Sequence, residues 1–210
     1  MAFAAFKDKY PNLPLYLFGH SMGTLVARSY LKRYAKEIDK LILSGAVPKN
    51  NLVNLGMFLD KTIMLFKGDH YRSKLLVDLS MGPYIKRFSD EKYSNAWVCS
   101  DIKVVKKYHE DPLSGFPFTT NGYLNLFYLI KDTYNKKDLV LNNKKLPILF
   151  IAGSNDPVIE NEKKFIEEVN YLKDLGFSNI NYKLYKDMRH EILNDFCQKE
   201  VYKDILDFIK

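Results

Sequence analysis

The sequence contains little cysteine and no long apolar stretch. Its two cysteines, Cys99 and Cys197, lie far apart and lack the spacing of metal ligands, which excludes a disulfide-rich scaffold and a zinc site. No run approaches the roughly 18 apolar residues of a membrane-spanning helix. The first residues, MAFAAFKDKYP, also lack the basic and apolar regions of a signal peptide. We therefore expect a cytoplasmic protein that is at most peripheral to membranes.

Basic residues are in modest excess, but they are not clustered. The chain has 32 Lys and Arg against 25 Asp and Glu, a net charge of +7. Binding of single-stranded nucleic acid needs basic tracts beside stacking aromatic residues, so we expect no nucleic-acid partner. The surplus of positive charge does favour weak contact with anionic membrane surfaces.

Apolar runs alternate with helical patterns over most of the 210 residues. A buried parallel strand is apolar at consecutive positions. Segments of this kind are 13–19, 39–46, 146–154 and 180–187, the last more alternating, as in an edge strand. Helical periodicity follows at 22–36, 160–175 and 195–209. Strands that alternate with helices predict a single α/β domain with a parallel sheet.

Residues 48–140 interrupt this alternation. No convincing strand occurs there, and the pattern predicts an inserted helical subdomain whose segments are separated by Gly-Pro and Asp-Pro breaks. The expected helices are 51–66, 71–80, 89–98, 101–109 and 121–134. The many apolar and aromatic side chains of the insertion suit either its own core or the lining of an apolar pocket.

The pentapeptide GHSMG, from Gly19 to Gly23, follows an apolar strand and opens a helix. A nucleophile elbow occupies this position, with the serine on a strained turn and glycines on both sides that let strand and helix approach. Ser21 would be the nucleophile, and the backbone amide of Met22 at the helix N-terminus would stabilise the oxyanion. The alternative is an ordinary glycine-rich turn.

A serine nucleophile needs a base, and the base needs a carboxylate that fixes its tautomer. When the serine lies on such a strand-to-helix turn, the acid and the histidine follow later strands, in the chain order Ser, Asp, His. Asp156 follows the strand 146–154 and His190 follows the strand 180–187. Asp174, late in a helix, and Asp187, on the same loop as His190, are less suitable acids.

The other histidines are less suitable bases. His20 lies beside the serine within the elbow, too close in sequence to reach it as a base, and we expect it to shape the turn. His70 and His109 lie among charged residues of the insertion, where we expect exposed surface positions. The sequence thus favours a triad of Ser21, Asp156 and His190.

These motifs together resemble one family. GHSMG at 19–23, GSNDPV at 153–158, RHEILN at 189–194 and, within the insertion, NAWVCSD at 95–101 and DPL at 111–113 resemble the α/β-hydrolases of the monoacylglycerol lipase and lysophospholipase group, also described as serine aminopeptidase-like hydrolases. The resemblance implies an α/β-hydrolase fold in which residues 48–140 form a cap over an acyl-binding cleft. It also implies hydrolysis of a small-molecule acyl ester of lipid-like, monoacyl type, without a metal or an organic cofactor.

The sequence departs from this group before the elbow. There the group has a strand-rich segment with a His-Gly loop that supplies a second oxyanion donor, and this sequence contains no His-Gly pair. We therefore expect the chain to correspond to the C-terminal portion of such an enzyme. The strand 13–19, which we predict to be buried on both faces, would then keep an open edge through which the chain self-associates.

Slow ester hydrolysis is expected, because loss of one oxyanion donor typically costs on the order of 10²- to 10³-fold in turnover. Two alternatives stay open. One is a non-catalytic remnant that pairs with a partner through the open edge. The other is a different α/β-hydrolase activity, that of a peptidase or a thioesterase.

Overall fold

A four-stranded parallel sheet lies at the centre of the computed structural model, which describes residues 2–137, 139–140 and 142–210. Its strands are β1 (Tyr16–His20), β2 (Lys40–Ser44), β3 (Ile148–Gly153) and β4 (Ile180–Tyr185), in the order β1-β2-β3-β4. Each neighbouring pair is parallel. The carboxyl ends of the strands therefore meet at one end of the sheet, where open α/β sheets bind their ligands.

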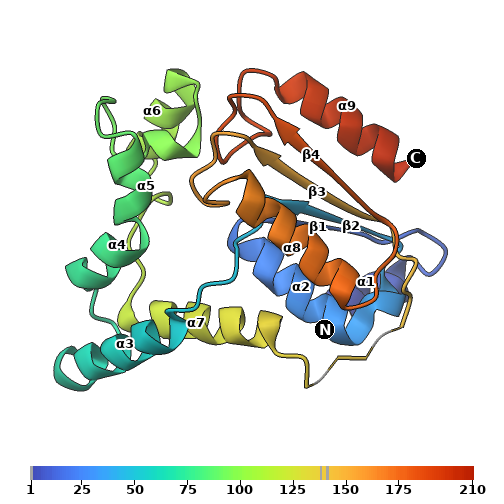
Figure 1. Cartoon of the computed structure of the whole chain (residues 1–210), viewed down its shortest axis with the longest axis horizontal. Helices are drawn as coiled ribbons and strands as arrows, with labels where there is room; N and C mark the ends of the chain where they lie inside the picture. The colour runs from blue at the N-terminus through green and yellow to red at the C-terminus, as the bar shows by residue number, and fades with distance from the viewer. Residues whose placement is uncertain (1, 138, 141) are drawn as a thin grey trace.

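Helices cover both faces of the sheet, as the predicted α/β architecture requires (Figure 1). One face packs against α2 (Met22–Tyr34) and α8 (Glu162–Asp174) through alternate strand residues such as Leu43 and Phe150. The other face packs against α9 (Gln198–Ile209) through Ile42 and Ile151. Every residue of β3 is buried, which explains its uninterrupted apolar sequence. The short helix α1 (Ala2–Lys9) precedes β1, and a 3₁₀ turn (Ala35–Glu37) follows α2.

Strand β1 is less buried than its sequence predicted. Tyr16 is 38% exposed and Phe18 is 39% exposed, so the prediction that this strand is buried on both faces was wrong. In the described part of the chain β1 pairs only with β2, and α9 packs on residues of β2, β3 and β4. Among the described residues, no layer covers the face of β1 that carries Tyr16 and Phe18.

Between β2 and β3 the chain forms a helical insertion, by which we mean the described residues from 48 to 140. Figure 1 shows it to one side of the sheet. Its helices are α3 (Val53–Lys67), α4 (Lys74–Ser80), α5 (Gly82–Arg87), a 3₁₀ turn (Ala96–Val98), α6 (Ile102–Glu110) and α7 (Thr120–Tyr134). No strand occurs among these residues of the insertion. Within the described chain, none of the helices is long and apolar enough to cross a membrane.

Most predicted helices are confirmed to within a few residues at their ends, but the one at 89–98 was wrong. The break expected at Gly82 and Pro83 lies one residue earlier, at Met81 between α4 and α5, and Gly82 and Pro83 begin α5. Proline suits the first turn of a helix because its fixed φ is already helical and its missing N–H is not needed there. Residues 88–95 form turns instead, since their Ser, Asp and Asn side chains compete for backbone hydrogen bonds.

A buried ionic network ties the insertion to the sheet domain. Arg28 of α2, only 1% exposed, forms an ion pair with Glu168 of α8. The same guanidinium donates to Tyr134 Oη of α7 at 3.1 Å and to the carbonyl of Val47 at 2.6 Å. Glu168 also accepts a hydrogen bond from the amide of Lys49 at 2.9 Å. Because each buried charge is paired and hydrogen-bonded, the network fixes both the exit from β2 and the end of α7.

Candidate active site

Ser21 lies on the sharp turn between β1 and α2. Its φ is 52° and its ψ is −122°, a backbone conformation that is uncommon for a residue other than glycine and is concentrated at functional sites. The turn is fixed on both sides: the Ser21 amide donates to the carbonyl of Ser44 at 2.9 Å, and the Ser21 carbonyl accepts from the Thr24 amide at 2.9 Å. Ser21 therefore lies on a strained turn that joins a strand to a helix.

The two glycines of the motif contribute differently. A Cβ atom at Gly19 would lie 2.6 Å from the carbonyl oxygen of Gly23, so strand and helix approach here as closely as only glycine permits. A Cβ atom at Gly23 would have no neighbour within 4 Å. The steric explanation from the sequence therefore applies to Gly19 and was wrong for Gly23.

Asp156 and His190 form a buried pair beyond the ends of β3 and β4. Asp156 Oδ2 lies 2.9 Å from His190 Nδ1, and the other carboxylate oxygen, Oδ1, accepts from the Val158 amide at 2.8 Å. Asp156 is 1% exposed and His190 is 3% exposed. When Nδ1 donates to the carboxylate, Nε2 keeps a free lone pair with which it can accept a proton. By contrast, Asp174 and Asp187 are exposed to solvent.

The electrostatic environment favours a protonated His190. Burial lowers the pKa of an imidazole, but here the neighbouring carboxylates of Asp156 and then Glu191 outweigh it, and the pKa of His190 is raised. A cationic intermediate on this imidazole is thus stabilised.

The turn that carries Ser21 lies next to this pair. The ring of His20 lies 4.6 Å, centroid to centroid, from the ring of His190. Within the described residues no hydrogen bond joins Ser21 Oγ to the imidazole. Such bonds are often long before a substrate arrives. The structure thus brings Asp156 and His190 into contact and places the serine turn beside them.

The remaining histidines do not take part in the hydrogen bond between Asp156 and His190. His20 Nδ1 lies 3.3 Å from Ser44 Oγ, and its Nε2 lies 3.2 Å from Glu191 Oε1. It therefore links the turn to the residue after His190, and the pKa of Glu191 is lowered mainly by this contact. His70 and His109 are both on the exposed surface of the insertion, as predicted.

Sequence reasoning missed Gly45, which directly follows β2. Its φ is +58°, and a Cβ atom there would lie 2.8 Å from His190 Cε1 and 3.2 Å from Asp156 Oδ2. Glycine at this position leaves room for the aspartate–histidine pair. Its place at the end of a strand, next to the expected site, was the signal that could have revealed it.

A set of hydrogen bonds holds the loop of His190 to the insertion. Arg189 Nη1 donates to the carbonyl of Ala96 at 2.6 Å, and the amide of Glu191 donates to the carbonyl of Val98 at 2.7 Å. Asp195, fully buried, accepts from the amides of Arg189 at 2.9 Å and Ser100 at 3.2 Å. These bonds fix the backbone on both sides of His190.

A cavity of about 690 Å³ lies within the insertion. Trp97 lines it, and the same indole ring lies 5.4 Å from the ring of His190. Most of the other lining side chains are apolar or aromatic, among them Val77, Met81, Ile85, Leu113, Phe116 and Phe118, while Arg72 and Lys74 are basic. Across residues 2–137, 139–140 and 142–210, no three His, Cys, Asp or Glu side chains lie close enough together to hold a metal ion.

Comparison with known families agrees with this geometry. Residues 1–196 match the hydrolase family described as serine aminopeptidase, S33. The chain belongs to the serine aminopeptidase S33 family. The parallel sheet and its flanking helices match the α/β-hydrolase fold of solved structures, which confirms the predicted fold class.

Similar proteins include lipases and esterases. The chain is 23% identical to a monoacylglycerol lipase of Mycolicibacterium smegmatis and 24% identical to a monoglyceride lipase homolog of monkeypox virus. The match to the first relative includes 96% of this chain, and the match to the second includes 95%. In both cases the matched part is only 64% of the relative's own length. A carboxyl esterase of Bacillus coagulans solved with glycerol is similar at a TM-score of 0.83 and 26% identity, covering 98% of this chain and 67% of that one.

Proposed function

We propose that this S33-family chain is a serine hydrolase that cleaves carboxylic esters of lipid-like monoacyl substrates. The observation that carries the proposal is the buried Asp156–His190 pair, 2.9 Å apart, beside the strained turn of Ser21. A carboxylate that orients an imidazole, next to a serine on an elbow, is the arrangement that activates a hydroxyl for attack on a carbonyl.

The reaction would proceed through an acyl-enzyme. Nε2 of His190 takes the Ser21 hydroxyl proton as Oγ bonds to the carbonyl carbon, and the carbonyl π electrons move onto oxygen. The Met22 amide, in the first turn of α2 where N–H groups lack intrahelical partners, donates to this oxyanion. The intermediate collapses, and the leaving alkoxide takes the proton from His190. A water molecule activated by His190 then hydrolyses the acyl-enzyme in the same way.

The proposed substrate class rests on the cavity and on the relatives. An apolar cavity of about 690 Å³ whose wall includes Trp97, beside His190, suits an acyl chain. The names monoacylglycerol lipase and monoglyceride lipase homolog of the two relatives support a small acyl ester. The insertion would then act as the cap over the acyl-binding cleft.

Hydrolysis by the 210-residue chain should be slow. We assign one oxyanion donor, the Met22 amide. Loss of one of the two donors that normally act together lowers turnover on the order of 10²- to 10³-fold. Turnover of p-nitrophenyl esters of increasing acyl length tests the proposal. We expect slow hydrolysis that favours longer chains over acetate and is lost in Ser21→Ala and His190→Ala.

The matched control is His70→Ala, which removes an exposed histidine of the insertion and should leave turnover unchanged. Ester hydrolysis that persists in Ser21→Ala would contradict the proposal. The description of the family as serine aminopeptidases favours a second candidate, hydrolysis of aminoacyl amides. Aminoacyl p-nitroanilides in the same assay distinguish the two, and an absence of Ser21-dependent turnover on both would favour a non-catalytic chain.

A further inference from the structure

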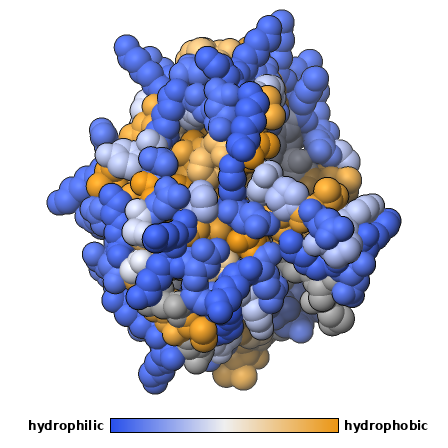
Figure 2. Space-filling view, turned by 90° about the vertical axis from the view of Figure 1, so that its right-hand side faces the viewer, coloured by the Kyte–Doolittle hydropathy of each residue, from blue (hydrophilic) through white to orange (hydrophobic). Residues whose placement is uncertain are grey.

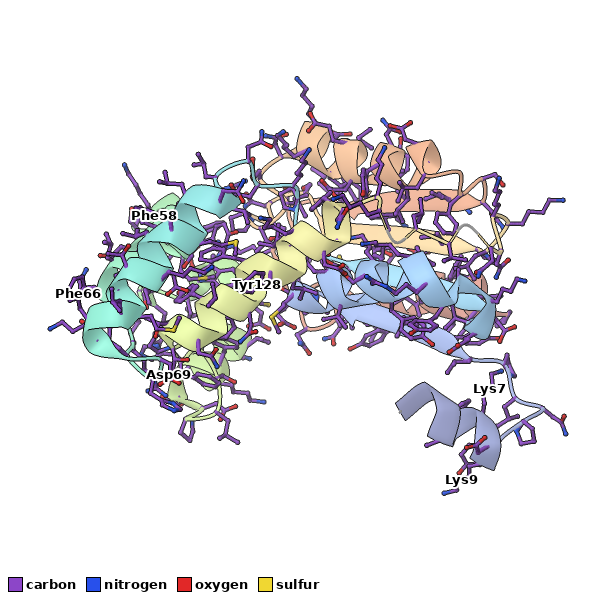
Figure 3. The ribbon with its side chains drawn as sticks, turned by 90° about the horizontal axis from the view of Figure 1, so that it is seen from below. Lys7, Lys9, Phe58, Phe66, Asp69 and Tyr128 are labelled. Atoms are coloured by element: carbon purple, nitrogen blue, oxygen red, sulfur yellow. The ribbon has the colours of Figure 1, made fainter. Side chains whose placement is uncertain are left out.

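Two basic side chains, Arg72 and Lys74, line the cavity within the insertion, and both are exposed to solvent. Ser73 between them is buried and has extended backbone, and its Oγ accepts from the Leu76 amide at 3.4 Å at the start of α4. Because side chains alternate along extended backbone, Arg72 and Lys74 lie on the same side of the chain. Figure 3 shows Asp69, which precedes them, at the end of the insertion that lies away from the sheet.

The positive charge of the cavity is not balanced within it. No acidic side chain is among the described residues that line the cavity. In the part of the chain that the structure describes, the guanidinium of Arg72 forms no hydrogen bond or ion pair. Lys74 Nζ lies 2.5 Å from Asp78 Oδ2, in an ion pair that is exposed to solvent. The free guanidinium and the surplus of positive charge favour a ligand that carries an anionic group.

An apolar wall leads from these cations to the neighbourhood of His190. Three apolar side chains line the cavity at four-residue intervals along α4 and α5, which keeps them on one side of the helical path: Val77, Met81 and Ile85. A helical rise of about 1.5 Å per residue separates Lys74 from the last of them by about 16 Å. At that end Tyr84 of α5 lies 5.4 Å from Trp97, ring centroid to ring centroid, and Trp97 lies 5.4 Å from His190.

We propose that this cavity binds free fatty-acid anions, with the carboxylate at Arg72 and Lys74 and the hydrocarbon chain along the apolar wall toward Trp97. The planar guanidinium of Arg72 can donate two parallel hydrogen bonds to a carboxylate. A volume of about 690 Å³ lies within the range of small-molecule sites. The cavity thus has a cationic end for the carboxylate and an apolar wall for the chain.

Such binding has a regulatory consequence, which rests on the proposed function. An ester substrate must hold its carbonyl near Ser21, so its acyl chain would point from the catalytic pair toward the cations. A fatty-acid anion bound with its carboxylate at Arg72 lies in the opposite direction. It occupies the space of the acyl chain but keeps its carboxylate away from Ser21, and it therefore inhibits the enzyme that releases it.

The fluorescence of Trp97 tests the binding, because this residue is the only tryptophan of the sequence and lines the cavity. The full chain carrying Ser21→Ala is titrated with dodecanoate, with dodecanol and with acetate, each below the concentration at which micelles form. We expect saturable changes in emission with dodecanoate, weaker binding of dodecanol, and none of acetate. Adding Arg72→Gln and Lys74→Gln should raise the Kd for dodecanoate about fivefold or more and leave the Kd for dodecanol unchanged.

The matched control is Lys199→Gln with Lys203→Gln, which removes two exposed cations of α9. They lie at the end of the molecule that faces the viewer in Figure 2, where hydrophilic side chains protrude between hydrophobic ones. This variant should bind dodecanoate like its parent, and circular dichroism verifies that both double variants are folded. No saturable binding of dodecanoate, an unchanged Kd in Arg72→Gln with Lys74→Gln, or an equal loss for dodecanol would overturn the proposal.

Inhibition is measured separately, in the chain that keeps Ser21. Dodecanoate should inhibit turnover of p-nitrophenyl esters competitively, and its inhibition constant should rise in Arg72→Gln with Lys74→Gln by the same factor as the Kd. Binding of dodecanoate without any Ser21-dependent hydrolysis would keep the fatty-acid site and refute the proposed function. Ser21-dependent hydrolysis without dodecanoate binding would refute the fatty-acid site alone.

Discussion

Gly45→Ala should damage activity far more than it damages the fold. The new Cβ would lie 2.8 Å from His190 Cε1, and ordinary contact begins at 3.4 Å, so the ring must move by at least about half an ångström. A displacement near 1 Å in a catalytic constellation can cost about 10²-fold. The φ of +58° adds roughly 1–2 kcal/mol of backbone strain. We expect about a 10²-fold fall in kcat/KM for p-nitrophenyl esters and a modest loss of stability in urea.

Gly68→Ala provides the matched control. Gly68 also has a positive φ, +84°, but a Cβ atom there would have no neighbour within 4 Å. This variant should lose a comparable amount of stability by urea unfolding while keeping its kcat/KM. Similar losses of activity in both variants, or an undiminished kcat/KM in Gly45→Ala, would refute the role assigned to Gly45.

Two further predictions concern charge. Glu191→Gln should move the acid limb of the pH profile of kcat/KM to lower pH. The Glu191 carboxylate helps to raise the pKa of His190, and the imidazole must be neutral to act as a base. An acid limb at the same pH in both proteins would refute the effect of Glu191 on His190. Asp60 of α3 is fully buried, neither carboxylate oxygen has a hydrogen-bond partner among the described residues, and desolvation raises its pKa to about 6. Because the folded state then holds this proton more tightly than the unfolded state, stability should fall as pH rises from the ordinary carboxyl range through 6. Asp60→Asn should reduce this pH-dependent loss of stability by about 1–3 kcal/mol. Urea unfolding of both proteins at pH values below and above 6 measures the loss, and an equal pH dependence of the two would contradict the reasoning.

The parts of the fold that depend on local pattern were predictable. The segment 146–154 is apolar at consecutive positions because β3 is covered on both faces, and it was found to within two residues at its start. The burial of β1 was not predictable in the same way, since it depends on which layers cover the strand. The helix at 89–98 failed because polar turn-forming residues outweighed a loose apolar periodicity.

Some residues of the candidate site were predictable from local sequence pattern, and others were not. Asp156 and His190 could be identified because each follows a strand, and parallel strands bring their carboxyl ends together. No local sequence pattern identifies Asp195 as part of the site. It accepts a hydrogen bond from the amide of Ser100, 95 residues earlier, and its role arises only when the insertion meets the loop of His190. The same holds for Arg189, whose hydrogen bond to Ala96 spans 93 residues.

The activation of Ser21 by His190 is the central claim, and covalent labelling tests it most directly. A fluorophosphonate probe reacts only with a serine whose proton is removed by a base, and mass spectrometry locates the adduct. We predict an adduct on Ser21 that is absent in Ser21→Ala, is formed far more slowly in His190→Ala, and is formed normally when exposed His109 is replaced by Ala. An adduct on another serine, no adduct, or labelling that does not depend on His190 would contradict the account.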